Sequence, residues 1–162
     1  YMQRLEALLN SWIVSWRYHQ AYGAQQSPWG GMTIKRAGLA EIAVPSKFLT
    51  CRDTAKTDLT NPWLLCPKAD QAQLTQCAVS LVKRLNDARS HHDYAQMYAL
   101  DADLQPYLAR LYGCTQPEFE HIATWFTARD RQRRPMTTYG ALPDLDLNSV
   151  LNPRIDEPRT ER

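Results

Sequence analysis

The residues that most often carry chemistry in a chain of this kind are its cysteines and histidines. The 162 residues include four of each, and no two cysteines have the Cys-x-x-Cys spacing of a zinc or redox site. No histidine pair follows at zinc-finger spacing, and the adjacent His91 and His92 lie at the polar end of a predicted helix, as solvated residues commonly do. We interpret the cysteines as free thiols in a reducing compartment and expect no metal site. The cysteines are Cys51, Cys66, Cys77 and Cys114.

Catalytic motifs are also missing from the sequence. There is no glycine-rich phosphate loop, no dinucleotide-binding fingerprint and no nucleophile elbow. Residues 61–63, Asn-Pro-Trp, match part of the Asn-Pro-Pro-aromatic motif with which adenine methyltransferases hold a flipped base. The second proline is missing and no cofactor-binding strand precedes it, so we interpret this match as a coincidence. The chain is predicted to be non-catalytic and to hold no cofactor.

Two groups of residues have the composition of a nucleic-acid contact. One is the turn formed by Trp29, Gly30 and Gly31 with the following Lys35 and Arg36, where glycines would let backbone amides approach phosphates. Residues 1–56 contain seven basic side chains against three acidic ones. The second group is a basic cluster of Arg129, Arg131, Arg133 and Arg134. Each group fits sequence-independent attraction to DNA, and each also fits ordinary solvated charge. For the arginine cluster, the partial negative charge of a helix C-terminus also favours cations.

The composition places these residues on a globular scaffold. Hydrophobic residues make up 44% and charged residues 22%, and the net charge is only +2, which neither requires nor excludes an anionic partner. No run of about 18 apolar residues is present, so we expect no membrane contact and a cytoplasmic location. Tyr1 precedes Met2, which either processing or a longer parent would explain; we expect the chain to be a piece of a longer polypeptide.

Apolar residues recur at helical spacing in several segments. The strongest local signal is Thr115-Gln116-Pro117-Glu118, which has the pattern of a capping box. Short β-prone stretches occur around residues 32–44, and the prolines after residue 135 indicate a disordered or docking tail. The sequence therefore predicts a mainly α fold with a small β element and a helical bundle in the C-terminal half. The predicted helices cover residues 2–22, 69–89, 93–100, 106–112 and 116–129.

We divide the chain into three parts. Residues 1–68 form a helix with short strands and a connector, residues 69–129 form a helical subdomain, and residues 130–162 form a basic, proline-rich tail. The connector over residues 46–68 is predicted to be irregular and to lie over a core.

Two stretches of the sequence together resemble one protein family. Residues 8–11 read Leu-Leu-Asn-Ser, residues 30–34 read Gly-Gly-Met-Thr-Ile, and residues 39–45 end in Ile-Ala-Val-Pro. Residues 108–115 read Leu-Ala-Arg-Leu-Tyr-Gly-Cys-Thr, and residues 117–122 continue Pro-Glu-Phe-Glu-His-Ile. In this order the stretches resemble the C-terminal target-recognition region of large adenine-specific DNA methyltransferases. These are the type IIG restriction–modification enzymes and the methyltransferases of BREX and DISARM phage-defence systems.

The resemblance implies that the chain recognises double-stranded DNA while a separate domain methylates adenine at N6. It implies S-adenosylmethionine as the cofactor of that other domain, and other subunits of a defence complex as further partners. Three departures are present: Cys114 replaces the usual leucine, Ile42-Ala43 replaces Leu-Pro, and the chain continues for over thirty residues beyond the last predicted helix. A second hypothesis, from a different class, is a helical protein–protein interaction or scaffold module.

Overall fold

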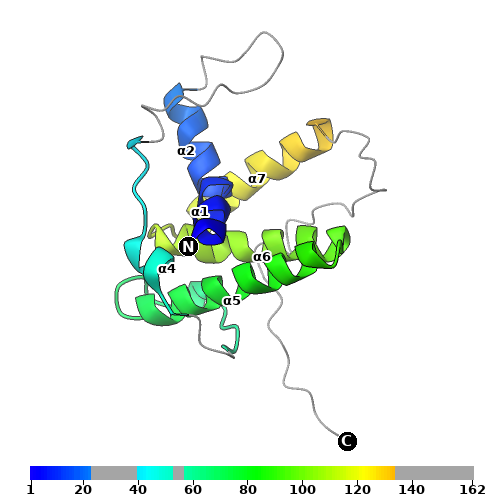
Figure 1. Cartoon of the computed structure of the whole chain (residues 1–162). Helices are drawn as coiled ribbons and strands as arrows, with labels where there is room; N and C mark the ends of the chain where they lie inside the picture. The colour runs from blue at the N-terminus through cyan, green and yellow to red at the C-terminus, as the bar shows by residue number, and fades with distance from the viewer. Residues whose placement is uncertain (23–39, 53–56, 134–162) are drawn as a thin grey trace, which may run out of the picture.

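A computed structural model describes residues 1–22, 40–52 and 57–133 and confirms a mainly α fold (Figure 1). The small β element expected around residues 32–44 is not found in its described part: residues 40–44 form no strand, and residues 32–39 lie outside the described residues, as does the predicted tail beyond residue 133. The elements are α1 (Met2–Leu9), α2 (Trp12–Tyr22), α4 (Ser46–Thr50), the 3₁₀ turn η1 (Pro62–Leu64), α5 (Gln71–Ser90), α6 (Tyr94–Leu111) and α7 (Gln116–Arg133).

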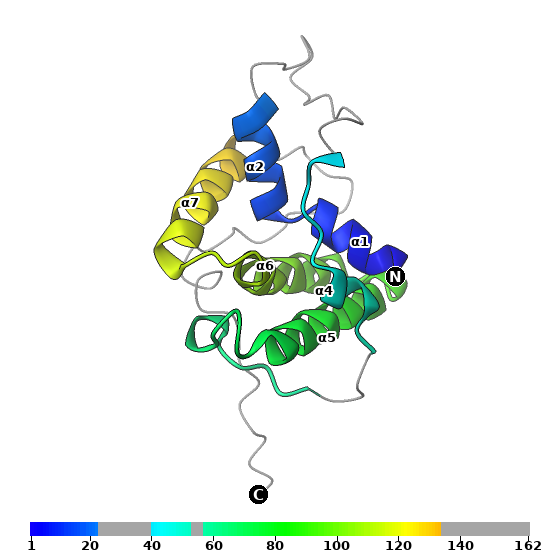
Figure 2. The same cartoon turned by 90° about the vertical axis from the view of Figure 1, so that its left-hand side faces the viewer.

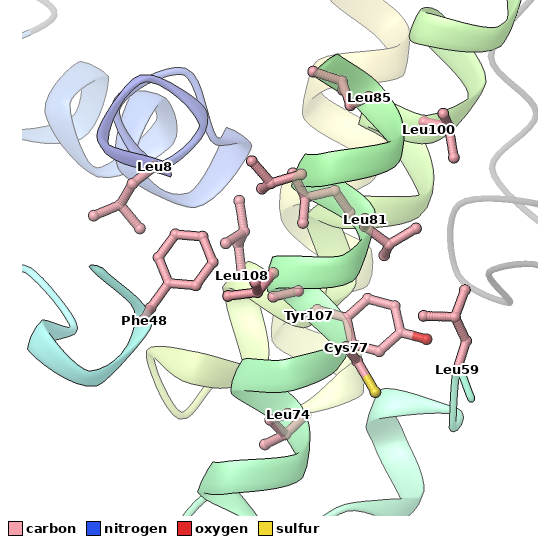
Figure 3. Packing of buried hydrophobic residues seen from close by; sticks show 14 of the residues in the cluster. Leu8, Phe48, Leu59, Leu74, Cys77, Leu81, Leu85, Leu100, Tyr107 and Leu108 are labelled. Atoms are coloured by element: carbon pink, nitrogen blue, oxygen red, sulfur yellow. The ribbon is translucent and has the colours of Figure 1, made fainter. Parts of the chain in front are cut away.

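Helices α5 and α6 lie side by side and form the body of the molecule (Figures 1 and 2). Their facing sides are apolar, and α1 and α4 cover the pair with Leu8 and Phe48, both fully buried. Figure 3 shows these two side chains directed toward α5, with Tyr107 of α6 packed beside Cys77. This hydrophobic cluster contains residues from both sides of position 68, so burial of apolar surface holds the first and second halves of the chain together.

The connector between α4 and α5 is held against the body by side chains that bind its backbone carbonyl groups. Tyr107 donates its hydroxyl to the carbonyl of Thr60 at 3.1 Å, and Arg110 donates twice to the carbonyl of Leu65, at 3.0 and 3.2 Å. Earlier in the chain, Arg4 of α1 binds the carbonyl groups at the end of α4. These contacts satisfy backbone acceptors that an irregular segment cannot satisfy by itself.

Helices α2 and α7 form a second unit, which we call the arm. Both helices leave the body on the same side and point away from α5 and α6 (Figures 1 and 2). A separate hydrophobic cluster joins them, built on Trp12 of α2 and on Phe119 and Ile122 of α7. Ala102 and Ala109 of α6 complete this cluster at the base of the arm, where small side chains let α2 and α7 approach the body closely.

The first predicted helix is interrupted. A continuous helix over residues 2–22 was the expectation, whereas α1 ends at Leu9 and α2 begins at Trp12. Ser11 causes a local break: its fully buried hydroxyl donates to the carbonyl of Leu8 at 2.6 Å and accepts the N–H of Val14 at 3.4 Å. Serine competes in this way for backbone groups and favours the start of a new helix.

The opposite difference occurs in α6. Two short helices separated before Pro106 were expected, but one helix runs from Tyr94 to Leu111 and contains Pro106. A proline removes one backbone hydrogen bond from a helix interior. Here Leu104 and Leu108 on either side of Pro106 are fully buried against α5 and α1, and their packing keeps the helix continuous in spite of that loss.

Candidate nucleic-acid interface

The turn predicted to contact DNA follows α2 directly in the chain. Its five candidate residues lie in the segment 23–39, outside the described residues. The structure therefore places the end of α2 from which this segment continues, and not the side chains themselves. The five residues are Trp29, Gly30, Gly31, Lys35 and Arg36.

The second candidate group lies at the end of α7. The backbone of Arg129, Arg131 and Arg133 forms the last turns of this helix, which extends beyond the expected end at residue 129. Their side chains, and Arg134 as a whole, lie outside the described residues. A helix C-terminus carries a partial negative charge, which favours cations at these positions.

Ring contacts hold α2 and α7 together along the arm. Trp12 stacks on Phe126 at a centroid distance of 5.3 Å and on Phe119 at 6.2 Å. Nearer the tip, His19 of α2 lies 5.0 Å from the ring of Trp125. Aromatic contacts of this kind add to the burial of the same surface. As a result, the C-terminal ends of α2 and α7, next to the two candidate groups, lie on one side of the molecule. About a hundred residues separate these helix ends in sequence.

The start of α7 is fixed by the turn that follows α6. Gly113 has a φ of +82°, a left-handed conformation that ends α6 without the steric cost of a side chain. The carboxylate of Glu118 then accepts both the backbone N–H of Thr115 at 2.7 Å and its hydroxyl at 2.8 Å. These hydrogen bonds lower the pKa of Glu118 below its ordinary value. The predicted return of Glu118 to the N–H of Thr115 is thus confirmed, and this turn sets the direction of α7.

The start of α2 is fixed by a buried side chain that sequence reasoning missed. Gln105 of α6 is 1% exposed, and its Oε1 accepts the N–H of Trp12 at 2.9 Å. Its Nε2 donates to Asp101 at 3.1 Å. Burial raises the pKa of Asp101 to about 6, while the Gln105 hydrogen bond and the charge of Arg89 oppose that rise. A polar residue in an apolar helix was the only available signal, and it does not identify the partner.

Some of the excess basic side chains in the first third of the chain donate hydrogen bonds to other parts of the fold. Arg4 binds the carbonyl groups at the end of α4, and Lys47 donates to Gln71 at 2.9 Å. Arg17, in contrast, is exposed on α2. It lies near enough to Tyr112 for its charge to oppose the burial that raises the Tyr112 pKa to about 12. We therefore add Arg17 to the candidate cations of the arm. In the sequence, the one signal for this role is its position on the polar side of the helix.

The other chemistry-bearing residues are dispersed. Burial raises the pKa of Cys77 and raises that of Cys114 to about 11, whereas backbone N–H groups of Ala69 and Lys68 lower the pKa of the exposed Cys66. No three histidine, cysteine or acidic side chains converge on a metal-sized site within residues 1–22, 40–52 and 57–133. In the same ranges, no helix has the length and apolar character needed to cross a bilayer.

Comparisons of the chain with protein-family models, with curated proteins and with solved structures give no significant match.

Proposed function

We propose that this chain is the DNA-binding target-recognition region of an adenine-N6 DNA methyltransferase from a restriction–modification or phage-defence system. The proposal places the S-adenosylmethionine site and the methyl transfer in a separate catalytic domain of the parent protein. In this arrangement the chain binds duplex DNA and sets the target, while the other domain flips and methylates the base.

The observation that carries the proposal is that the stretches underlying the resemblance pack together. Leu8, from the first stretch, and Leu108, from the second, are buried in one hydrophobic cluster. The hydroxyl of Tyr112 donates to the carbonyl of Ala43 at 2.8 Å and so joins the two stretches again. Their contact supports a single shared unit as the source of the sequence pattern.

The arm gives the proposal a location. The segment that contains the candidate turn begins after α2, and the arginine cluster begins in the last turns of α7; the ends of these two helices lie on the same side of the molecule. Exposed Arg17 adds a cation to the arm itself. We expect this side to approach the phosphates of a duplex, with positioning by backbone amides and cations.

Binding to duplex DNA as a function of salt tests this proposal. We expect the logarithm of the affinity to fall steeply and linearly with the logarithm of salt concentration, because phosphate contacts release counterions. The charge-reversing pair Lys35→Glu and Arg36→Glu should abolish binding. A matched control is the pair Arg52→Glu and Lys68→Glu, which reverses two exposed cations outside the arm. An affinity indifferent to salt, or equal losses in both pairs, would contradict the proposal.

The second candidate function is a helical interaction module, and one observation favours it. Trp16, Trp125 and Phe126 on the arm are only partly buried, and partly exposed aromatic side chains are common in protein interfaces. The same charge-reversed variants distinguish the two functions. Loss of DNA binding at unchanged oligomeric mass supports DNA recognition. A changed mass without any effect on DNA supports the interaction module.

A further inference from the structure

The joint between the body and the arm contains a relay of hydrogen bonds that begins at a partly buried carboxylate and ends at a buried backbone N–H. It starts at Asp101 on α6, whose Oδ1 accepts Nε2 of Gln105 at 3.1 Å. It ends at Trp12, the first residue of α2, whose N–H binds Oε1 of Gln105 at 2.9 Å. The first N–H groups of a helix have no partner within the helix, so this relay supplies one of them and ties α2 to α6.

A salt bridge connects α1, the helix before the same break, to α5. Glu6 of α1 and Arg89 of α5 are joined by two N–O contacts of 3.2 Å. The charge of Arg89 also acts on Asp101. The end of α1 and the start of α2 are therefore connected to α5 and α6 through one set of side chains. Asp101 is the member of this set that accepts the hydrogen bond of the relay and also feels the charge of Arg89.

We propose that the charge on Asp101 controls how firmly the first turn of α2 is held to α6, so that the joint between body and arm is acid-sensitive. An ionised carboxylate only accepts hydrogen bonds. It therefore keeps the NH₂ group of Gln105 directed toward itself and Oε1 directed toward Trp12. A neutral carboxyl group also donates, which permits the Gln105 amide to turn over and leave the N–H of Trp12 without its acceptor.

Loss of the charge weakens the relay in a second way. A hydrogen bond to an ionised acceptor is roughly twice as strong as one between neutral groups. Burial raises the pKa of Asp101 to about 6, which brings the change near physiological pH. Two side chains act on Asp101: Gln105 on the same helix through its hydrogen bond, and Arg89 on α5 through its charge. Arg89 is in turn paired with Glu6 on α1.

Acidification should therefore have opposite effects on the joint and on the whole fold. The fold gains stability when a buried charge is neutralised, because the cost of its desolvation disappears. The joint loses its charge-assisted hydrogen bond over the same pH range. Weaker hydrogen bonding at the joint, together with higher stability of the whole fold, distinguishes this mechanism from ordinary acid unfolding. In acid unfolding, both would decrease together.

Hydrogen exchange measured by NMR on the full chain tests this inference. After correction for intrinsic exchange, we expect the protection of the Trp12 amide to fall about fivefold between pH 7.5 and pH 5. The reason is that the Gln105–Asp101 hydrogen bond, which holds the acceptor of this amide in place, changes from a charged to a neutral acceptor. Core amides of α5, such as that of Leu81, should keep or increase their protection. A Trp12 amide whose protection stays constant, or rises with the core, would overturn the inference.

Variants assign the effect to Asp101. In Asp101→Asn the protection of Trp12 should no longer depend on pH, whereas Asp87→Asn, at an exposed acid on α5, should behave like the unmodified chain. Arg89→Met removes the cation that favours ionised Asp101 and should move the midpoint to higher pH; because Arg89 is exposed, this variant is expected to fold. If Asp101→Asn retains the transition, another group is responsible and the inference fails. The inference does not depend on DNA binding.

Discussion

Replacing Asp101 by asparagine should stabilise the protein at neutral and alkaline pH. Asparagine has nearly the same size and shape, and its side-chain oxygen is able to accept the hydrogen bond from Gln105 that the carboxylate accepts now. The substitution removes a charge from a position where burial disfavours it. The substitution leaves no cavity, so the electrostatic contribution dominates the measured change.

The size of the effect follows from the pKa. A rise from 3.8 to about 6 corresponds to about 3 kcal/mol of lost stability, since one pKa unit is worth about 1.4 kcal/mol. This shift already includes the opposing hydrogen bond from Gln105 and the charge of Arg89. The value is an upper limit because Asp101 is only partly buried, so solvent screens its charge. We expect a net gain of about 1 to 2 kcal/mol at pH 8.

The direction of the pH dependence is a stricter test than the magnitude. The folded chain binds a proton at Asp101 more tightly than the unfolded chain does, so its stability rises as the pH falls from about 6 toward 3.8. The advantage of Asp101→Asn should be fully present above pH 6 and nearly absent at pH 4. Urea unfolding followed by tryptophan fluorescence at pH 8, 6 and 4 measures the difference between the two proteins at each pH. Asp87→Asn serves as the exposed control and should show little difference at any pH.

Two results would refute the reasoning. If Asp101→Asn were destabilising at pH 8, the attraction to Arg89 and the bond from Gln105 would outweigh the cost of burial. If the gain were the same at pH 8 and pH 4, ionisation of Asp101 would not be its source. In the second case a change in packing or in the unfolded chain would account for it.

Substitutions at four positions test the turns that orient the helices, each by the midpoint of urea unfolding. His92 has a φ of +56° between α5 and α6, so His92→Gly should stabilise the fold by about 0.5 to 1 kcal/mol, and His92→Ala should give no such gain. Gly113→Ala should cost about 1 kcal/mol because of its φ of +82° alone, since an added methyl group meets no atom within 4 Å; a neutral result would contradict the conformational argument. Thr115→Ala should cost about 1 kcal/mol, and Glu118→Gln should remove a stabilisation that the unmodified chain loses as the pH falls through the lowered Glu118 pKa. If the stability of Glu118→Gln followed the same pH curve as the unmodified chain, Glu118 would not be the titrating group.

The helices could largely be predicted from local pattern. Residues 69–89 were expected to be helical and α5 covers Gln71–Ser90, while the helix expected at 116 begins there as α7. Both signals are local: apolar residues at helical spacing in α5, and a capping pair three residues apart in α7. The helix break at Ser11 and the continuous α6 were missed, and the connector predicted to be irregular contains the short helix α4 and the turn η1. Each depends on burial of side chains against other elements.

The candidate DNA-binding groups were chosen by composition, and they stay predictions. Glycines and cations in a turn, or arginines at a helix end, have the same sequence pattern whether they bind DNA or only water. Arg4 is an example of a cation that composition alone would assign to DNA. It belongs to the excess of basic residues in the first third of the chain, yet its guanidinium donates to carbonyl groups at the end of α4. Arg17 was not singled out although it is exposed on the arm.

The sequence by itself determined most of the segments that become helices and which side of them is apolar, since backbone hydrogen bonds and side-chain periodicity act over a few residues. Only the tertiary structure decided that α7 packs on α2 and not within a bundle of the C-terminal half. That choice depends on how Trp12, Phe119 and Phe126 fit together. It also depends on the buried bond from Trp12 to Gln105. Such contacts join residues about a hundred positions apart, and no local pattern specifies their partners.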